Sequence, residues 1–142
     1  MGKNTQIANE LFADGFSCSA SVFGGFSEKY GLEKETAVKL ACGLGGGCRA
    51  GEICGAVSGA ALVIGLGYGQ TETENAEQKA ECSRRTAEFI KAFHDKFGAL
   101  TCRDLIGIDV TTEEGRAQLS EKRQICAGLV TASAQILEDA GY

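Results

Sequence analysis

Residues 43–69 read GLGGGCRAGEICGAVSGAALVIGLGYG, and they predict a buried central helix around which the chain folds. A glycine-rich loop that carries Cys48 leads to Cys54, at the start of a predicted helix. No charged residue occurs between Ile53 and Leu66. A helix without a polar face is expected to be buried on all sides. The run is shorter than the roughly 20 apolar residues that cross a membrane, so we expect no membrane insertion.

Small residues recur along this predicted helix. Gly51, Gly55 and Gly59 follow one another at intervals of four, while Ile53, Val57, Ala60 and Ile64 form a bulkier side at helical spacing. Each glycine inside a helix costs roughly 0.5 to 1 kcal/mol relative to alanine. Three of them therefore indicate a requirement for close approach. We predict that a neighbouring helix, a loop or a cofactor approaches here, and we take the three glycines as candidate cofactor contacts.

The composition is typical of a helical protein. The chain has 142 residues, 20 glycines and no proline, and it shows no convincing run of alternating strand residues. Its length fits one domain, residues 1–142, with a sizeable core. We expect an all-α, compact, single-domain bundle of about five or six helices around the buried, glycine-rich central helix.

Hydrophobic periodicity and capping residues place the other helices. The predicted ranges are 3–13, 17–30 with Ser17 as N-cap, 33–44, about 75–97, a single turn that begins at Thr101, and 111–139 with Thr111 and Glu114 as a capping box. Gly24 and Gly25 fall inside the second range, where they either weaken the helix or mark a close crossing. The range ending at residue 97 is expected to be the longest exposed helix.

Charge and the N-terminus restrict partners and compartment. The net charge is −5, without a basic stripe, which argues against nucleic acid and anionic lipid as partners. No apolar segment follows Lys3, so we expect no secretory signal and a cytoplasmic location. The sequence leaves open a homo-oligomer, the identity of a redox partner, and whether the protein is an enzyme.

Seven cysteines are the main candidates for chemistry. They include no C-x-x-C and no haem-attachment motif, and their irregular spacing encodes no local metal knuckle. A site could still assemble from several helices.

Cys18, Cys54 and Cys102 are predicted in first turns of helices, where the helix dipole favours a thiolate. Cys42, Cys82 and Cys126 fit core stripes as small hydrophobes. Cys48 fits either a ligand or a surface thiol, and the lone His94 is expected to have no catalytic role.

The cysteine layout resembles that of a known family. Residues 54–59 read CGAVSG and are similar to the CGAxxG motif of the C-GCAxxG-C-C family of bacterial proteins, which are classed as redox-active. Gly15 to Cys18, Gly51-Glu52, Cys102 to Leu105 and a cysteine in the last helix agree with the same layout. The resemblance implies that the family's four cysteines are Cys18, Cys54, Cys102 and Cys126. A related domain in split-Soret cytochromes is associated with an iron–sulfur cluster beside haem, and this chain lacks the haem motif.

Three functions remain open at this point. In the first, these four cysteines ligate an iron–sulfur cluster, or zinc or another thiophilic metal, for electron transfer or metal handling. In the second, the protein holds no metal and Cys54 is the reactive thiol of a thiol–disulfide exchange protein. In the third, the protein has no redox role and its thiols are merely buried.

Overall fold

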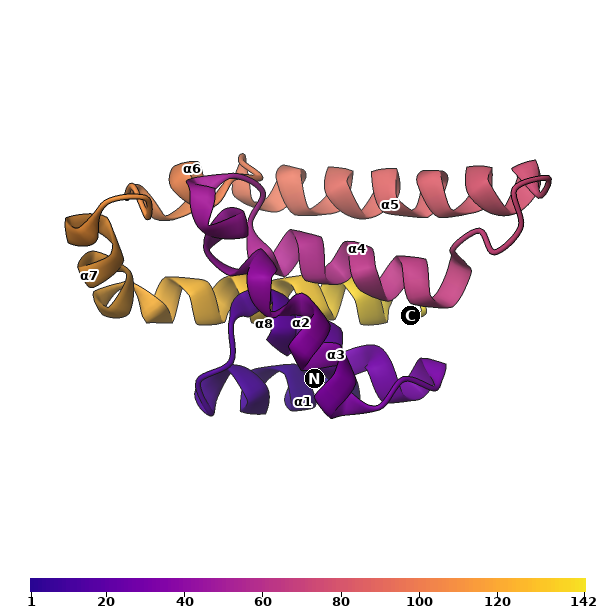
Figure 1. Cartoon of the computed structure of the whole chain (residues 1–142), viewed down its shortest axis with the longest axis horizontal. Coiled ribbons are helices and arrows are strands. Elements are labelled where there is room, and N and C mark those ends of the chain that lie inside the picture. Colours follow the sequence, from indigo (N-terminus) through magenta and orange to yellow (C-terminus); the bar gives the residue numbers. More distant parts are fainter.

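The computed structural model describes all residues, 1–142, and consists of α-helices joined by short turns (Figure 1). The helices are α1 (Lys3–Ala13), α2 (Cys18–Ser27), α3 (Lys34–Ala41), α4 (Gly55–Tyr68), α5 (Ala76–Phe97), α6 (Cys102–Ile106), α7 (Glu113–Glu121) and α8 (Arg123–Asp139). Extended backbone pairing is limited to one bridge, between Ile53 and Thr101. The all-α prediction is confirmed, but the number of helices is eight rather than five or six.

The C-terminal region accounts for much of this difference. The single helix predicted over 111–139 is two helices, α7 and α8, which meet at Lys122 (φ −100°, ψ 15°). The Lys122 ammonium group donates a hydrogen bond to the Ile106 carbonyl at 3.2 Å. The predicted cap is also displaced by one residue, since Thr112 accepts the Gly115 N–H at 2.9 Å. The break brings the next residues, including Cys126, to the start of a helix.

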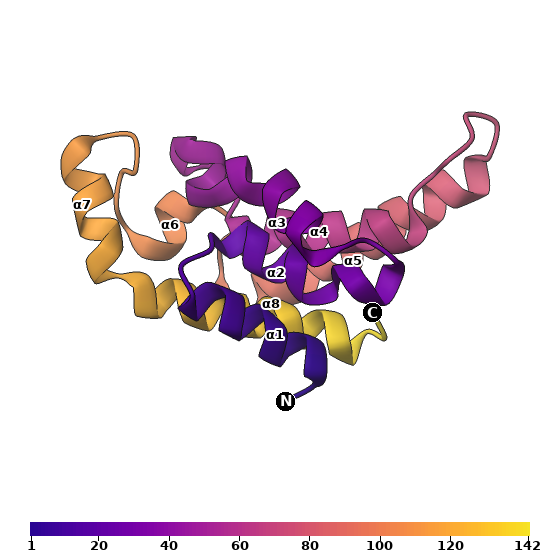
Figure 2. The same ribbon diagram turned by 60° about the horizontal axis from the view of Figure 1, so that its bottom comes forward.

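Helix α2 is the most completely buried element. Every residue from Ser19 to Ser27 is buried, and α2 packs against α1, α3, α4 and α8. Helix α4 lies between α2 and the long helix α5, and α1 lies along α8 (Figure 2). The predicted burial of α4 on all sides is wrong at its end, where Leu66 is 36% exposed. Ile53 precedes the helix and is 44% exposed.

Glycines bring α2 and its neighbours into close contact. A Cβ atom on Gly59 would lie 2.7 Å from the Ser19 carbonyl oxygen, and one on Gly55 would lie 3.0 Å from the Ser19 nitrogen. On the other side of α2, a Cβ on Gly25 would lie 2.8 Å from the Ala8 Cβ. The distances at Gly59 and Gly25 are shorter than those of real Cβ contacts, and the distance at Gly55 is tighter than most of them. The predicted close crossing at Gly24-Gly25 is therefore confirmed, and α4 crosses α2 in the same manner.

The longest and the most apolar helices are different elements. Helix α5 has 22 residues and carries many charged side chains, which confirms the prediction for the range ending at residue 97. Helix α4 has no charged residue but only 14 residues. None of the helices combines the length and apolar character that a membrane span requires.

Candidate functional site

Four cysteines lie where four helices begin, around one cavity. Cys18 is the first residue of α2, Cys54 directly precedes α4, Cys102 is the first residue of α6, and Cys126 lies in the first turn of α8. All four line a cavity of about 320 Å³. The loop before α4 and the helix α6 contact each other at this end of the molecule (Figure 1). All seven cysteines of the chain are free thiols.

Local capping residues fix two of these helix starts. Ser17 accepts the backbone N–H of Ala20 at 3.2 Å, which starts α2 at Cys18. Thr101 accepts the N–H of Asp104 at 3.2 Å, which starts α6 at Cys102. Both caps agree with the predictions from sequence. Such caps are typically worth about 1 kcal/mol each, so the position of each cysteine is coupled to the stability of its helix.

The β-bridge holds Cys54 and Cys102 on adjacent segments. The backbone N–H of Cys54 donates to the Leu100 carbonyl at 2.8 Å, and that of Cys102 donates to the Glu52 carbonyl at 2.7 Å. The Arg103 side chain adds bonds to Glu52 at 3.0 Å and to the Ala50 carbonyl at 3.1 Å. Cys54 and Cys102 are thus fixed relative to each other by the main chain.

The rest of the cavity wall is apolar or positively charged. Its apolar part consists of Phe12, Ile106, Leu119 and Leu129, while Ser17, Cys42 and several glycines add small groups. Arg49 and Arg123 are the only charged residues that line it. The Arg123 guanidinium lies 3.8 Å from the centre of the Phe12 ring and donates to the Phe12 and Phe16 carbonyls. Neither arginine could be assigned to the site from the sequence alone.

The cavity environment separates the four thiols by their pKa values. Cys18 and Cys126 lie within hydrogen-bonding reach of each other, which raises the pKa of Cys18 and lowers that of Cys126 to about 7. The positive charge of Arg123 also lowers the pKa of Cys126. These shifts favour the proton on Cys18 and the negative charge on Cys126.

Cys54 and Cys102 are held as thiols. Burial raises the pKa of Cys54 to about 11, although the N–H groups of Ala56 and Val57 face its sulfur and lower it in part. Burial also raises the pKa of Cys102. The prediction that a helix start favours the thiolate of these two residues is therefore wrong, because desolvation outweighs the helix dipole. The lowered pKa belongs instead to Cys126, which falls in the middle of the helix predicted over 111–139.

The other three cysteines have different environments. Cys42 is exposed and lines the cavity, so its predicted place in the core is wrong. Cys48 is exposed and does not line the cavity. Cys82 is half-buried on α5 and packs against the hydrophobic core, as predicted. Gly55 lines the cavity, but Gly59 packs on α2 and Gly51 lies against Arg103.

The loop before α4 has an unusual backbone. Gly46, Gly47, Cys48 and Arg49 all have φ between 60° and 66°, which makes one turn of left-handed conformation. A residue with a side chain pays about 1–2 kcal/mol for this conformation. Two such residues in succession indicate that the surrounding contacts hold the loop in place.

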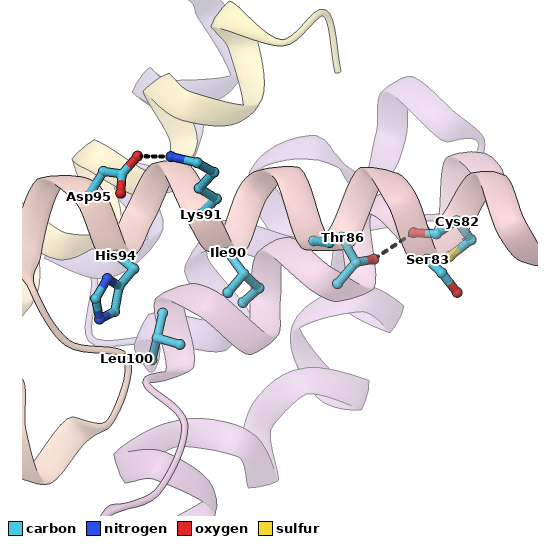
Figure 3. Close-up of a pocket in the computed structure, with 9 residues that line it drawn as sticks. Cys82, Ser83, Thr86, Ile90, Lys91, His94, Asp95 and Leu100 are labelled. Atoms are coloured by element: carbon cyan, nitrogen blue, oxygen red, sulfur yellow. Dashed lines mark hydrogen bonds and ion pairs between the residues drawn. The ribbon is translucent and has the colours of Figure 1, made fainter.

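A second hollow, of about 690 Å³, lies along α5 (Figure 3). Its lining includes Cys82, Ile90 and the exposed His94. Lys91 and Asp95 pair with each other at 2.6 Å, and the Thr86 hydroxyl donates to the Cys82 carbonyl at 2.8 Å. Most of its polar side chains are therefore satisfied within α5. We place the candidate site at the smaller cavity, where the thiols gather.

Two kinds of metal group place different demands on the cavity thiols. No three His, Cys, Asp or Glu side chains are arranged to hold a metal ion. Four thiolates on one zinc ion would lie about 2.3 Å from it and thus about 3.8 Å from one another. An iron–sulfur cluster takes its thiolates on different iron atoms, so its ligands are spread more widely. The four thiols share one cavity, but no three of them form the ligand group of a single ion.

Comparison with known proteins identifies a family for this chain. The family model described as "Putative redox-active protein (C_GCAxxG_C_C)" matches residues 16–140, a range that contains Cys18, Cys54, Cys102 and Cys126. No curated protein and no solved structure gives a significant match.

Proposed function

The chain belongs to the C_GCAxxG_C_C family of redox-active proteins, and on this premise we propose that Cys18, Cys54, Cys102 and Cys126 hold an iron–sulfur cluster. The observation that carries the proposal is the convergence of these four thiols, from four separate helix starts, on one cavity. Thiolates from separate segments are the usual ligands of such clusters. When bound, a cluster of this kind takes up and releases single electrons.

The residues of the chain are suited to holding such a group. Three of the four cysteines are buried, and apolar side chains such as Phe12 and Leu129 form part of the wall, which limits the access of water. The N–H groups of Ala56 and Val57 face the Cys54 sulfur and can donate to it as a thiolate. Arg49 and Arg123 offset the negative charge that four thiolates bring. Binding must displace the protons of Cys18, Cys54 and Cys102, so we expect the group to be taken up more readily as the pH rises.

The test is anaerobic reconstitution with iron and sulfide, followed by analysis of both elements and of visible charge-transfer absorption. We expect stoichiometric iron and sulfide in the wild type. Cys18→Ser, Cys54→Ser, Cys102→Ser and Cys126→Ser should each lose most of them. Cys82→Ser is the control, since Cys82 lies on α5 away from the cavity, and it should bind normally.

Two results would contradict the cluster. A folded wild-type protein that takes up neither iron nor sulfide would exclude it under these conditions. Equal loss in Cys82→Ser and in the four cavity variants would assign the effect to folding rather than to ligation. Uptake of zinc alone would favour the single-ion variant of the site.

A second candidate function is thiol–disulfide exchange through Cys18 and Cys126. The observation that favours it is the reach between their side chains, together with the lowered pKa of Cys126. Cys126 would attack a disulfide substrate, and Cys18 would then displace the second substrate thiol. The pair becomes a disulfide, and the substrate receives the two electrons and two protons as two thiols. In this function Cys126 takes the role that the sequence predicts for Cys54, whose raised pKa makes it a poor nucleophile at neutral pH.

Diagonal mapping of disulfides after mild oxidation tests this candidate. A Cys18–Cys126 linkage that forms faster than any other, in protein that binds no iron, would support it. Random pairing that includes the exposed Cys42 and Cys48 would contradict it.

A further inference from the structure

The opening of the cysteine cavity is positively charged, although the protein is acidic. Arg49 and Arg123 line the cavity, whereas none of the 19 Asp and Glu residues does. The ion pairs of the structure involve other basic residues, namely Arg84, Arg85, Lys91 and Arg103. Both cavity arginines are therefore free of carboxylate partners, in a chain of net charge −5.

The two arginines differ in how far they are already engaged. Arg123 is held by the Phe12 and Phe16 carbonyls and by the Phe12 ring. Arg49 makes no hydrogen bond through its guanidinium group, and its side chain folds back over Gly46, within 3.8 Å of where a Cβ would lie. The left-handed turn at Gly46–Arg49 carries it to this position. Arg49 thus presents unused donors at the cavity wall.

Exposure distinguishes an inner and an outer part of the cavity. Cys54, Cys102 and Cys126 are buried, while Cys42, Arg49 and Arg123 are exposed. The volume of about 320 Å³ falls at the lower end of the range of small-molecule sites, roughly 300–1,000 Å³. A small molecule that enters would meet the two guanidinium groups and Cys42 before it reached the buried thiols.

We propose that this opening binds a small anion with a carboxylate or phosphate group, and that such anions are the substrate class of the redox site. A guanidinium group presents paired donors that match the oxygens of these groups. The assignment of a substrate, though not the anion site itself, rests on the redox function proposed above. The competing explanation is that the arginines only balance the charge of the cavity thiolates. In that case, added anions would not bind at the opening.

Alkylation of Cys42 reports on the charge at the opening. The rates with anionic iodoacetate and neutral iodoacetamide would be measured for each cysteine by peptide mass spectrometry in cofactor-free, reduced protein. Cys82 is the internal reference because it lies outside the cavity. We expect the ratio of the iodoacetate rate to the iodoacetamide rate to be about threefold higher at Cys42 than at Cys82. One nearby unit charge in water has an effect of about this size. Arg49→Gln should abolish most of this difference, Arg49→Lys should keep it, and 1 M salt should suppress it.

Protection of Cys42 separates anion binding from charge balance alone. Inorganic phosphate and succinate should slow the reaction of Cys42 with neutral iodoacetamide in a saturable manner, whereas neutral succinamide should not. Arg49→Gln should remove the protection. Equal ratios at Cys42 and Cys82, an unchanged ratio in Arg49→Gln, or a raised ratio without protection would each overturn the proposal. Failure to bind iron and sulfide would instead affect only the cluster, because these measurements use cofactor-free protein.

Discussion

Ile53 and Thr101 are paired in an antiparallel β-bridge, and each is followed directly by a cysteine of the cavity. Hydrogen bonds of 2.8 and 2.7 Å flank the pair, from the N–H groups of Cys54 and Cys102. The chain between them includes all of α4 and α5, so this short contact closes a long loop. It makes the relative position of two site cysteines depend on backbone pairing rather than on side-chain packing alone.

Removal of the Thr101 cap should loosen Cys102. Thr101→Ala loses the bond to the Asp104 N–H, and we expect a loss of about 1 kcal/mol in the free energy of unfolding. Fraying of α6 should also increase the alkylation rate of the buried Cys102 severalfold. Urea denaturation and site-resolved alkylation would measure the two effects. Thr112→Ala is the control because it removes the equivalent cap of α7. If both variants exposed Cys102 equally, a local role of Thr101 would be contradicted.

The lowered pKa of Cys126 predicts a pH-dependent contribution to stability. In cofactor-free, reduced protein this pKa is about 7 in the folded state, against 9.0 for an ordinary thiol. The thiolate stabilises the fold fully above pH 9. This stabilisation is lost as the pH falls through 7, because Cys126 is then protonated in both the folded and the unfolded protein. The free energy of unfolding of the wild type minus that of Cys126→Ala should therefore rise by about 2 kcal/mol from pH 6 to pH 9. A constant difference would show that the thiolate is not stabilised.

Above pH 9 the buried thiols should act in the opposite direction. The pKa values of Cys18, Cys54 and Cys102 are raised in the folded protein, and that of Cys54 reaches about 11. Their contribution to the free energy of unfolding is complete below pH 9. It is lost as the pH rises through their pKa values in the folded protein. The apo protein should accordingly be less stable at pH 10.5 than at pH 8.5, as urea denaturation would measure. Cys54→Ala should reduce this alkaline loss, whereas replacement of the exposed Cys42 should not.

Strain at Cys48 predicts a stabilising substitution. Its φ of 60° costs about 1–2 kcal/mol for a residue with a side chain, whereas glycine adopts it freely but loses about 0.5–1 kcal/mol in chain entropy. Cys48→Gly should therefore raise the free energy of unfolding by about 0.5–1 kcal/mol. Cys42→Gly is the matched control, because Cys42 has ordinary helical angles (φ −55°, ψ −42°), and it should lower the same free energy. Thermal denaturation of both variants decides the matter, and equal signs would contradict the strain.

The sequence predicts helices well where capping and periodicity agree. The sequence predicts Ser17 as the cap of α2 and a helical turn that begins at Thr101, and both start where the structure has them. The break at Lys122 was missed because no glycine or proline marks it. Its cause is tertiary, since Lys122 bonds to the Ile106 carbonyl 16 residues away. No local pattern contains that information.

The candidate site shows the same limit. Similarity to a family motif identified Cys18, Cys54, Cys102 and Cys126, which line one cavity, but the helix-dipole argument gave the wrong thiolates. Charge state depends on burial and on Arg123, and neither can be obtained from spacing. Arg49 likewise reaches the cavity through the left-handed turn, which could be inferred only weakly from the three glycines at positions 45–47.

The crossing of α4 and α2 predicts opposite effects for two glycines of one helix. A Cβ on Gly59 would lie 2.7 Å from the Ser19 carbonyl oxygen, a backbone atom of the buried α2, so Gly59→Ala must push the helices apart. We expect a loss of about 1–3 kcal/mol in the free energy of unfolding, as overpacked cores show. Gly65, also in α4, has nothing within 4 Å of its Cβ position, and Gly65→Ala should gain about 0.5–1 kcal/mol from helix propensity. Because α2 begins at Cys18, Gly59→Ala should also move this thiol and lower the yield of reconstituted cluster, whereas Gly65→Ala should not. Denaturation and iron analysis of the two variants test both parts, and a neutral Gly59→Ala would show that the crossing tolerates a methyl group.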